Sequence, residues 1–425
     1  MKIGEIVSNH RQRVRIALAL GIIGGLMTLS FFLLFRPDPP TTFEVFYYAA
    51  ELSMEGPVQH ETGHGLWTYT PVSLLYFYPY AILFEYETAF VVHQILSVFV
   101  SFIYGSALAY FIGNRVSIKR IDKVLIVGFA SLSVYPVVNV INGSFVGIFT
   151  FMLGGGWLLL EYEKDSGGVA WALASLLKGY PAFWGVYLLR VKRWRATAAA
   201  IVTGVSATLL GVLIFGLDAY IRFFTVAGDN RVRLNKFRNG GSPDNEMMTP
   251  IRGLSQLFPN VDPTIWPIVI TIFVLIAAAL IYYLVPIETL NDRATLLLAT
   301  IIGVFFIMPT SQDMDAYLLY APLLVLLYTE RHAIVQGLYT VATIFLSYNV
   351  GRDELRAVSE ALGIAEWTMP IGEPILMFAK MPTYALYIIF AAILLSAWVK
   401  GKETGRLETL HEKMPLFPAN ESETR

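Results

Sequence analysis

Long runs of apolar residues limit the folds that this sequence can adopt. Residues 16–35 form one run without a charged side chain, and similar runs occupy 88–112, 196–216, 264–285 and 382–399. About 20 apolar residues at 1.5 Å each cross a ~30 Å hydrocarbon core. Inside lipid every backbone amide must be satisfied within the protein, so these runs are expected to be helices. The sequence predicts an all-α, polytopic transmembrane helix bundle embedded in the lipid bilayer.

The composition excludes several classes of partner and site. Only 15% of the 425 residues are charged, against about 25% in a soluble domain. The net charge of −1 gives no basic field for a nucleic acid, so none is expected as a partner. The absence of cysteine excludes disulfides and thiolate chemistry. His60, His64 and His93 lack the spacing of a metal site, and we expect neither a metal nor a cofactor.

Basic residues in the short connecting segments predict the orientation. The N-terminus, the segments 114–123 and 190–195, and the C-terminal tail all carry lysine and arginine. Such segments stay in the cytoplasm. We therefore expect a multi-pass protein of the cell membrane with both termini in the cytoplasm, divided into a transmembrane domain at 1–400 and a polar cytoplasmic tail at 401–425.

Two irregular apolar segments decide the order of the helices. Residues 71–84 are too short to span and contain a proline, which favours a re-entrant or interfacial segment in the first external loop. Residues 169–189 are interrupted at Lys178-Gly179-Tyr180-Pro181, where a proline breaks the helical hydrogen bonding. We expect a hairpin of two short limbs there.

The remaining spans then alternate across the membrane. They are predicted at 16–35, 88–112, 124–141, 145–161, 196–216, 264–285, 294–309, 316–328, 333–349 and 382–399. This order places Glu44, Asn142, Lys178, the loop 217–263 and the pair Asp313 and Asp315 on the non-cytoplasmic side.

Lys178 is a charged residue inside an apolar run. A cation at such a depth is unfavourable unless it is paired or reaches water. It could meet an anion such as a lipid phosphate, or it could extend its aliphatic stem to the interface. Its place at a helix break favours the anion.

The loop 217–263 is basic although it is predicted outside, which long loops permit. Its cationic residues are Arg231, Arg233, Lys236, Arg238 and Arg252. Arginine binds phosphate through two parallel hydrogen bonds, so this loop could close on a phosphate. It could equally be a solvated polar loop.

Three acidic residues are candidates for the site. Glu44 could act as a general base on an acceptor hydroxyl, but Thr41 and Glu44 also match a helix capping box. Asp313 and Asp315 could bind a sugar, pair with a basic loop, coordinate a cation, or be solvated turn residues.

Loose motifs in a fixed order point to a family. They are Phe43 to Ala50 with Gly56 and Tyr69-Thr70-Pro71, Asn142-Gly143-Ser144, Leu177-Lys178-Gly179-Tyr180-Pro181 with Arg193-Trp194-Arg195, Asn245 with Arg252, and Ser311. Over roughly residues 10 to 330 the chain resembles the glycosyltransferase family 87 membrane proteins. That family includes polyprenol-phosphate-mannose-dependent α-mannosyltransferases of the GT-C architecture.

The resemblance implies transfer of a hexose, mannose foremost, from a polyprenyl-phosphate sugar to a lipid or glycan acceptor outside the cell. Lys178 and the loop arginines would hold the departing phosphate, and Asn142, Tyr69 and Asn245 would bind the substrates. From their place between two apolar runs, we also predict that Asp313 and Asp315 bind the substrates. A carboxylate in the first external loop would activate the acceptor hydroxyl.

The sequence departs from the family at that carboxylate. The family's aspartate stands immediately before the position of Phe43, where this chain has Thr42. Either Glu44 or Asp38 replaces the base, or the protein is an inactive relative that acts in envelope assembly. A secondary transporter, a class in which ionisable residues also lie within the membrane, is a further alternative.

Overall fold

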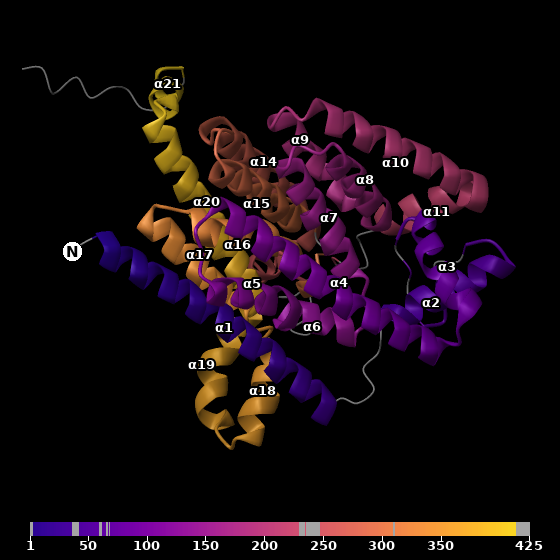
Figure 1. Cartoon of the computed structure of the whole chain (residues 1–425). Helices are drawn as coiled ribbons and strands as arrows, with labels where there is room; N and C mark the ends of the chain where they lie inside the picture. The colour runs from indigo at the N-terminus through magenta and orange to yellow at the C-terminus, as the bar shows by residue number, and fades with distance from the viewer. Residues whose placement is uncertain are drawn as a thin grey trace, which may run out of the picture.

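The computed structural model describes residues 3–35, 42–58, 62–64, 67, 69–228, 234, 247–308 and 311–413. Over these residues the chain is a bundle of helices without a strand, as predicted (Figure 1). An isolated antiparallel bridge joins Met247 to Gln312.

Seven helical segments among the described residues are long and apolar enough to cross a membrane. They are His10–Leu34 within α1 (Ile3–Phe35), α4 (Tyr86–Arg115), Arg120–Ile141 formed by α5 (Arg120–Leu132) and α6 (Val134–Ile141), α10 (Trp194–Phe215), Pro263–Leu284 formed by η4 (Pro263–Ile265) and α14 (Trp266–Leu284), α15 (Leu290–Ile307) and α20 (Met381–Glu403). They confirm the prediction of a polytopic membrane protein.

Three of the ten predicted spans are shorter than a regular span. The segment 145–161 is α7 (Val146–Glu161), and 333–349 is α17 (Ala333–Leu346). The segment 316–328 is divided between the 3₁₀ helix η5 (Asp313–Leu319) and α16 (Tyr320–Thr329). Nine of the ten α16 residues are buried. Irregular backbone is tolerated at membrane depth where protein surrounds it. The segment 316–328 can therefore lie at that depth without forming one regular helix.

The first loop folds into short helices instead of a span. Helix α2 (Thr42–Glu55) packs against α3 (Leu74–Leu83), which follows the 3₁₀ turn η1 (Pro71–Ser73) and contains Pro79. Apolar residues of α3 such as Ile82 and Leu83 are exposed. The apolar segment Pro71–Leu83 is shorter than the candidate spans, which agrees with the prediction that 71–84 does not cross the membrane.

The predicted hairpin at 169–189 is present. Helix α8 (Ser166–Lys178) ends at Gly179, whose φ of +51° is a conformation that glycine adopts readily. The chain returns through η2 (Tyr180–Trp184) and α9 (Gly185–Arg190). The ring of Trp171 lies 5.6 Å from that of Trp184, so the two limbs pack side by side.

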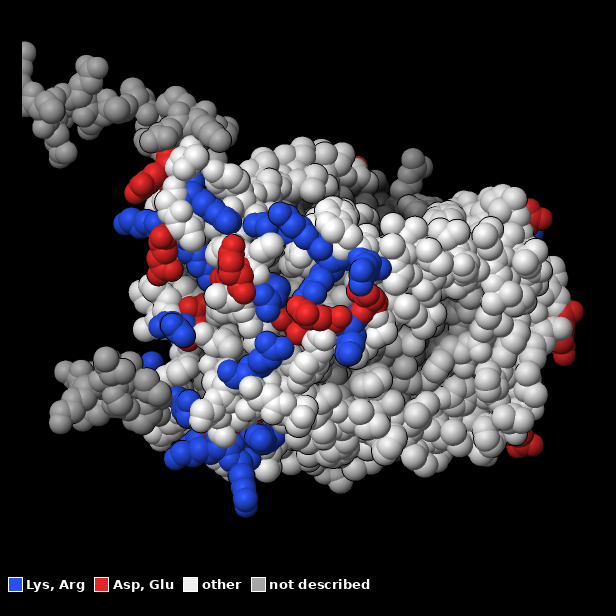
Figure 2. Space-filling view, turned by 45° about the horizontal axis from the view of Figure 1, so that its top comes forward, with Lys and Arg blue, Asp and Glu red and all other residues white. Residues whose placement is uncertain are grey.

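The four basic segments meet at one end of the bundle, here named the basic end. Arg15 pairs with Asp122 at 2.7 Å, joining the N-terminal helix to the segment 114–123. Arg190 donates to Val285 O, and Arg406 of α21 (Arg406–Lys413) donates to Tyr283 O. Lysine and arginine gather at this end and are sparse elsewhere on the face shown (Figure 2).

The opposite end is here named the site end. It is formed by α2, α3, the tip of α8, η5, α11 (Leu217–Gly228), α13 (Pro250–Leu257), α18 (Arg352–Ala361) and α19 (Ala365–Phe378). The division of the chain at residue 400 stays a prediction, and α20 runs through it to Glu403.

Candidate active site

Lys178 and Asp315 form a buried ion pair at the site end. The ammonium group of Lys178, at the tip of α8, donates to Oδ1 of Asp315 on η5. The two side chains are 13% and 1% exposed. The ammonium also lies 5.5 Å from the ring centre of Tyr180. The charge of Lys178 is therefore held inside the protein, close to a helix break, instead of extending alone to an interface.

The first loop reaches the same hairpin tip. Thr70 donates a hydrogen bond to the carbonyl of Leu176, two residues before Lys178. The adjacent Tyr69 ring packs edge-on against Phe46 at 5.0 Å and against Phe145 at 5.1 Å. This aromatic contact connects α2, which carries Glu44, with the segment that touches α8.

Asp313 has different partners from Asp315. Asn349 donates to its Oδ2 at 2.7 Å, and the ammonium of Lys380 lies 3.7 Å away. The backbone N–H of Met314 donates to its other oxygen. Both aspartates are buried, so neither is an ordinary solvated turn residue, and Asp313 ties η5 to the start of α20.

The end of the loop 217–263 lies beside η5. Met248 donates its N–H to Ser311 O at 2.7 Å, next to the bridge between Met247 and Gln312. On α13, Arg252 is 2% exposed and donates to the carbonyls of Leu376 and Met377 at 2.9 Å. These carbonyls belong to the last turn of α19, whose end has no intrahelical donors. Arg252 thus supports α19 as well as being a candidate for substrate binding.

Asn142 belongs to a turn packed beneath α2. Its carbonyl accepts a hydrogen bond from the N–H of Phe43 at 3.3 Å. Gly143 has a φ of +59°, and a Cβ there would lie 2.6 Å from both Phe43 and Phe90. The turn therefore requires glycine and positions the first turn of α2.

Glu44 pairs with a histidine from its own loop. Its Oε1 lies 2.7 Å from Nδ1 of His64, and both side chains are about one-third exposed. The His64 ring stacks on Tyr48 at 4.0 Å with an interplanar angle of 11°. Burial, with the charges of Glu44 and Glu51, raises the pKa of Tyr48, so its hydroxyl stays protonated.

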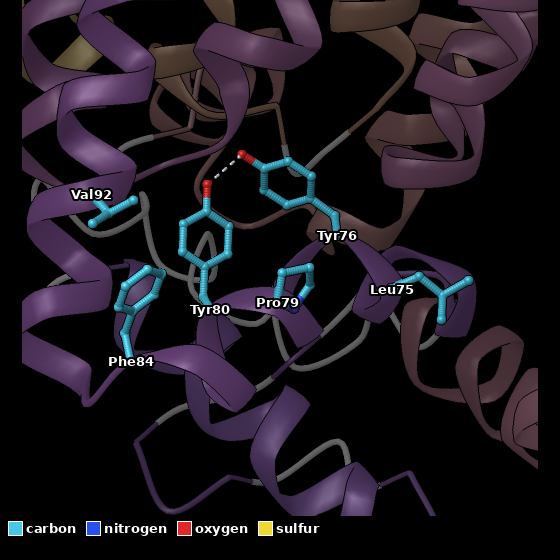
Figure 3. A pocket seen from close by; sticks show the side chains of 6 residues that line it. All are labelled: Leu75, Tyr76, Pro79, Tyr80, Phe84 and Val92. Carbon is cyan, nitrogen blue, oxygen red and sulfur yellow. Dashed lines mark hydrogen bonds between the residues drawn. The ribbon is translucent and has the colours of Figure 1, made fainter.

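An apolar groove opens between α3 and α4. It has a volume of about 410 Å³ and is lined by Leu75, Tyr76, Pro79, Tyr80, Phe84 and Val92 (Figure 3). The hydroxyls of Tyr76 and Tyr80 are 3.2 Å apart, and the Tyr80 ring lies 5.7 Å from that of Phe43. The groove therefore adjoins the first turn of α2.

Three predicted site residues lie outside the described residues, namely Asp38, Arg238 and Asn245. The same holds for Thr41, the predicted capping partner of Glu44. Among the described side chains, no group of three acidic or histidine residues could hold a metal ion.

The family model of glycosyltransferase family 87 matches residues 67–310, more than half of the chain. The chain belongs to glycosyltransferase family 87. A search of curated proteins gave no match. Membership of this family makes the chain a membrane glycosyltransferase.

The family 87 segment is narrower than the range of residues 10 to 330 expected from the motifs. It contains Tyr69, Asn142, Lys178 and Arg252. It begins after α2, which carries Glu44, and ends before η5. The pair of Lys178 with Asp315 thus joins a residue inside the matched segment to one just beyond it.

Sequence reasoning missed the partners of the candidate residues. His64 was considered only as a metal ligand, and no role was predicted for Lys380 or Asn349. These partners are separated from Glu44 and Asp313 by 20 to 67 positions, counted as 64 − 44 and 380 − 313. Sequence spacing therefore carries no signal for them.

Proposed function

We propose that this glycosyltransferase moves a hexose, mannose foremost, from a polyprenyl-phosphate sugar to a lipid or glycan acceptor. The observation that carries the proposal is the Lys178–Asp315 pair at the hairpin tip, beside Tyr69 of the first loop. A lysine held at a helix break by a single carboxylate oxygen can exchange that oxygen for the phosphate oxygen of a lipid donor.

The charge distribution supports the orientation. The protein would lie in the cell membrane. Segments rich in lysine and arginine stay in the cytoplasm, so the basic end would face the cytoplasm. Both termini would then be cytoplasmic, and the site end would face outward. A lipid-linked donor suits that side because nucleotide sugars are made inside the cell.

Lys178 would bind the leaving group. The acceptor oxygen forms a bond to the anomeric carbon while the bond from that carbon to the phosphate oxygen breaks. The electron pair of the broken bond leaves with the phosphate, where negative charge builds in the transition state. A cation held ready at that point lowers the barrier.

Glu44 would take the proton of the acceptor hydroxyl. Its pairing with His64 fixes the direction of the carboxylate, and its partial exposure leaves it open to an acceptor. Asp38 is the second candidate for this base. The apolar groove beside α2 has the size and lining for a hydrocarbon chain of a lipid substrate.

A transfer assay on purified protein in lipid tests the proposal. The donor is polyprenyl-phosphate-mannose, the acceptor a membrane glycolipid extract, and the variants are Lys178→Ala and Lys164→Ala. Lys164 is an exposed lysine at the other end of the same hairpin limb and serves as the matched control. We expect loss of transfer in Lys178→Ala alone.

Equal turnover in both variants would contradict the role of Lys178. Wild-type protein without transfer from any polyprenyl-phosphate sugar would favour an inactive relative, and uptake driven by an ion gradient would favour a transporter.

A further inference from the structure

A helical hairpin beyond the family segment connects two membrane helices. Helix α17 ends at Leu346 and α18 begins at Arg352, while α19 ends at Phe378 and α20 begins at Met381. The α18–α19 hairpin lies at the edge of the bundle, past the ends of α17 and α20 (Figure 1). With links this short, the hairpin cannot lie far from the membrane boundary.

The outer surface of this hairpin is apolar. On α19 the residues Trp367, Ile371 and Ile375 recur every four positions, which places them on one helix face. Trp367 is 80% exposed and Ile371 is 70% exposed. On α18 and the connecting turn, Val358, Leu362 and Ile364 are exposed as well. We name these six residues the hairpin face.

The two arginines of the hairpin both lie against one of its carboxylates. Arg352 of α18 pairs with Glu373 of α19, and Arg356 lies 3.8 Å from the same carboxylate. Residues 352–380 contain three basic side chains and five acidic ones, a formal charge of −2. Attraction to anionic lipid is therefore not expected, and only apolar insertion is left to hold the hairpin face.

We propose that the α18–α19 hairpin inserts its hairpin face into the boundary between lipid headgroups and acyl chains at the site end. The occupant is the bilayer around α17 and α20, because short links tie the hairpin to these two helices. Both helices expose apolar side chains of their own, such as Val341 on α17 and Trp398 on α20. Tryptophan is enriched at this depth, and amphipathic helices with an apolar face lie in the plane of the interface.

Insertion would fix the candidate site relative to the membrane. Lys380 and Asn349, at the two roots of the hairpin, both contact Asp313 of η5. Arg252 of α13 holds the last turn of α19. The neighbouring Asp315 pairs with Lys178, so the hairpin sets the depth of the element that holds Lys178.

The natural absence of cysteine makes a direct test possible. Trp367→Cys and Glu360→Cys are labelled separately with a nitroxide in phosphatidylcholine nanodiscs, and collisions with oxygen and with a nickel chelate are measured. Glu360 is the matched control because it is exposed on α18 about 200° around the helix from Val358. Ile371→Cys repeats the test on the hairpin face if Trp367→Cys does not fold.

We expect a several-fold lower collision rate with nickel at 367 than at 360, together with a higher rate with oxygen. Equal nickel accessibility at both positions would overturn it. Low collision rates with both reagents at 367 would also overturn it, because that pattern indicates a covering protein or a second copy. No substrate is present, so the result is independent of the proposed transferase activity.

Discussion

Two carboxylates at the basic end are paired differently from two carboxylates at the site end. At the basic end, Arg293 donates three hydrogen bonds to the carboxylate of Glu161 and two to carbonyls. Arg15 likewise contacts both oxygens of Asp122. At the site end, Lys178 contacts one oxygen of Asp315, and His64 contacts one oxygen of Glu44.

Donor geometry explains the difference. Arginine is a rigid fork that matches a carboxylate through two hydrogen bonds, whereas lysine is a compact charge on a flexible stem. Pairs of the first kind lock helices together. Pairs of the second kind can exchange one anion for another, which a substrate phosphate requires. The following variants test this contrast, from the largest expected effect to the smallest.

Replacing Glu44 should have the largest effect on the chemical step. Glu44→Gln keeps the size of the side chain and removes the base, so transfer should fall about 10²- to 10⁴-fold. The rate of transfer from polyprenyl-phosphate-mannose measures this. Retained transfer would exclude Glu44 as the base and leave Asp38 and Asp313 as the candidates. A thermal unfolding curve equal to that of the wild type would exclude a capping role for Glu44 as the cause of the loss.

Variants at Lys178 and Asp315 distinguish an effect on transfer from an effect on stability. Lys178→Met should reduce transfer about 10²- to 10³-fold. It also removes the cationic partner of the buried Asp315 carboxylate, so the protein should be destabilised by about 3–5 kcal/mol. The double variant Lys178→Met with Asp315→Leu should recover most of that stability and remain inactive. Recovery of transfer in the double variant would show that Lys178 is structural.

Replacing Arg293 at the basic end should lower stability without lowering transfer. Arg293→Ala leaves Glu161 buried and unpaired, so unfolding in detergent should become about 3–5 kcal/mol easier. Transfer per folded molecule should stay at the wild-type level, because this pair joins α7 to α15 at the end of the bundle opposite Lys178. A loss of turnover in folded protein would mean that the two ends are coupled.

Among the variants at the site end, His64→Gln should give the smallest loss of transfer. His64→Gln removes the ring that aligns Glu44 and stacks on Tyr48, and transfer should fall about ten-fold. The pH dependence of the rate distinguishes alignment from stability, since a structural loss would lower the rate equally at every pH. An unchanged rate and profile would leave Glu44 acting without His64.

The sequence predicted what local patterns determine. Apolar runs located the seven long helical segments, and the proline after Lys178 located the hairpin. Apolarity could not show that 316–328 is partly a 3₁₀ helix covered by protein, because burial in protein and burial in lipid select the same residues. Nor could it show the pairs of Lys178 with Asp315 and of Glu44 with His64, which depend on packing between distant segments.

Donor binding without acceptor tests the central claim most directly. The affinity for polyprenyl phosphate is measured in lipid for the wild type and for the double variant Lys178→Met with Asp315→Leu. We expect at least about ten-fold weaker binding by the variant, because a phosphate loses its cationic partner. Equal affinity in a variant that folds like the wild type would contradict the claim that Lys178 exchanges Asp315 for the donor phosphate.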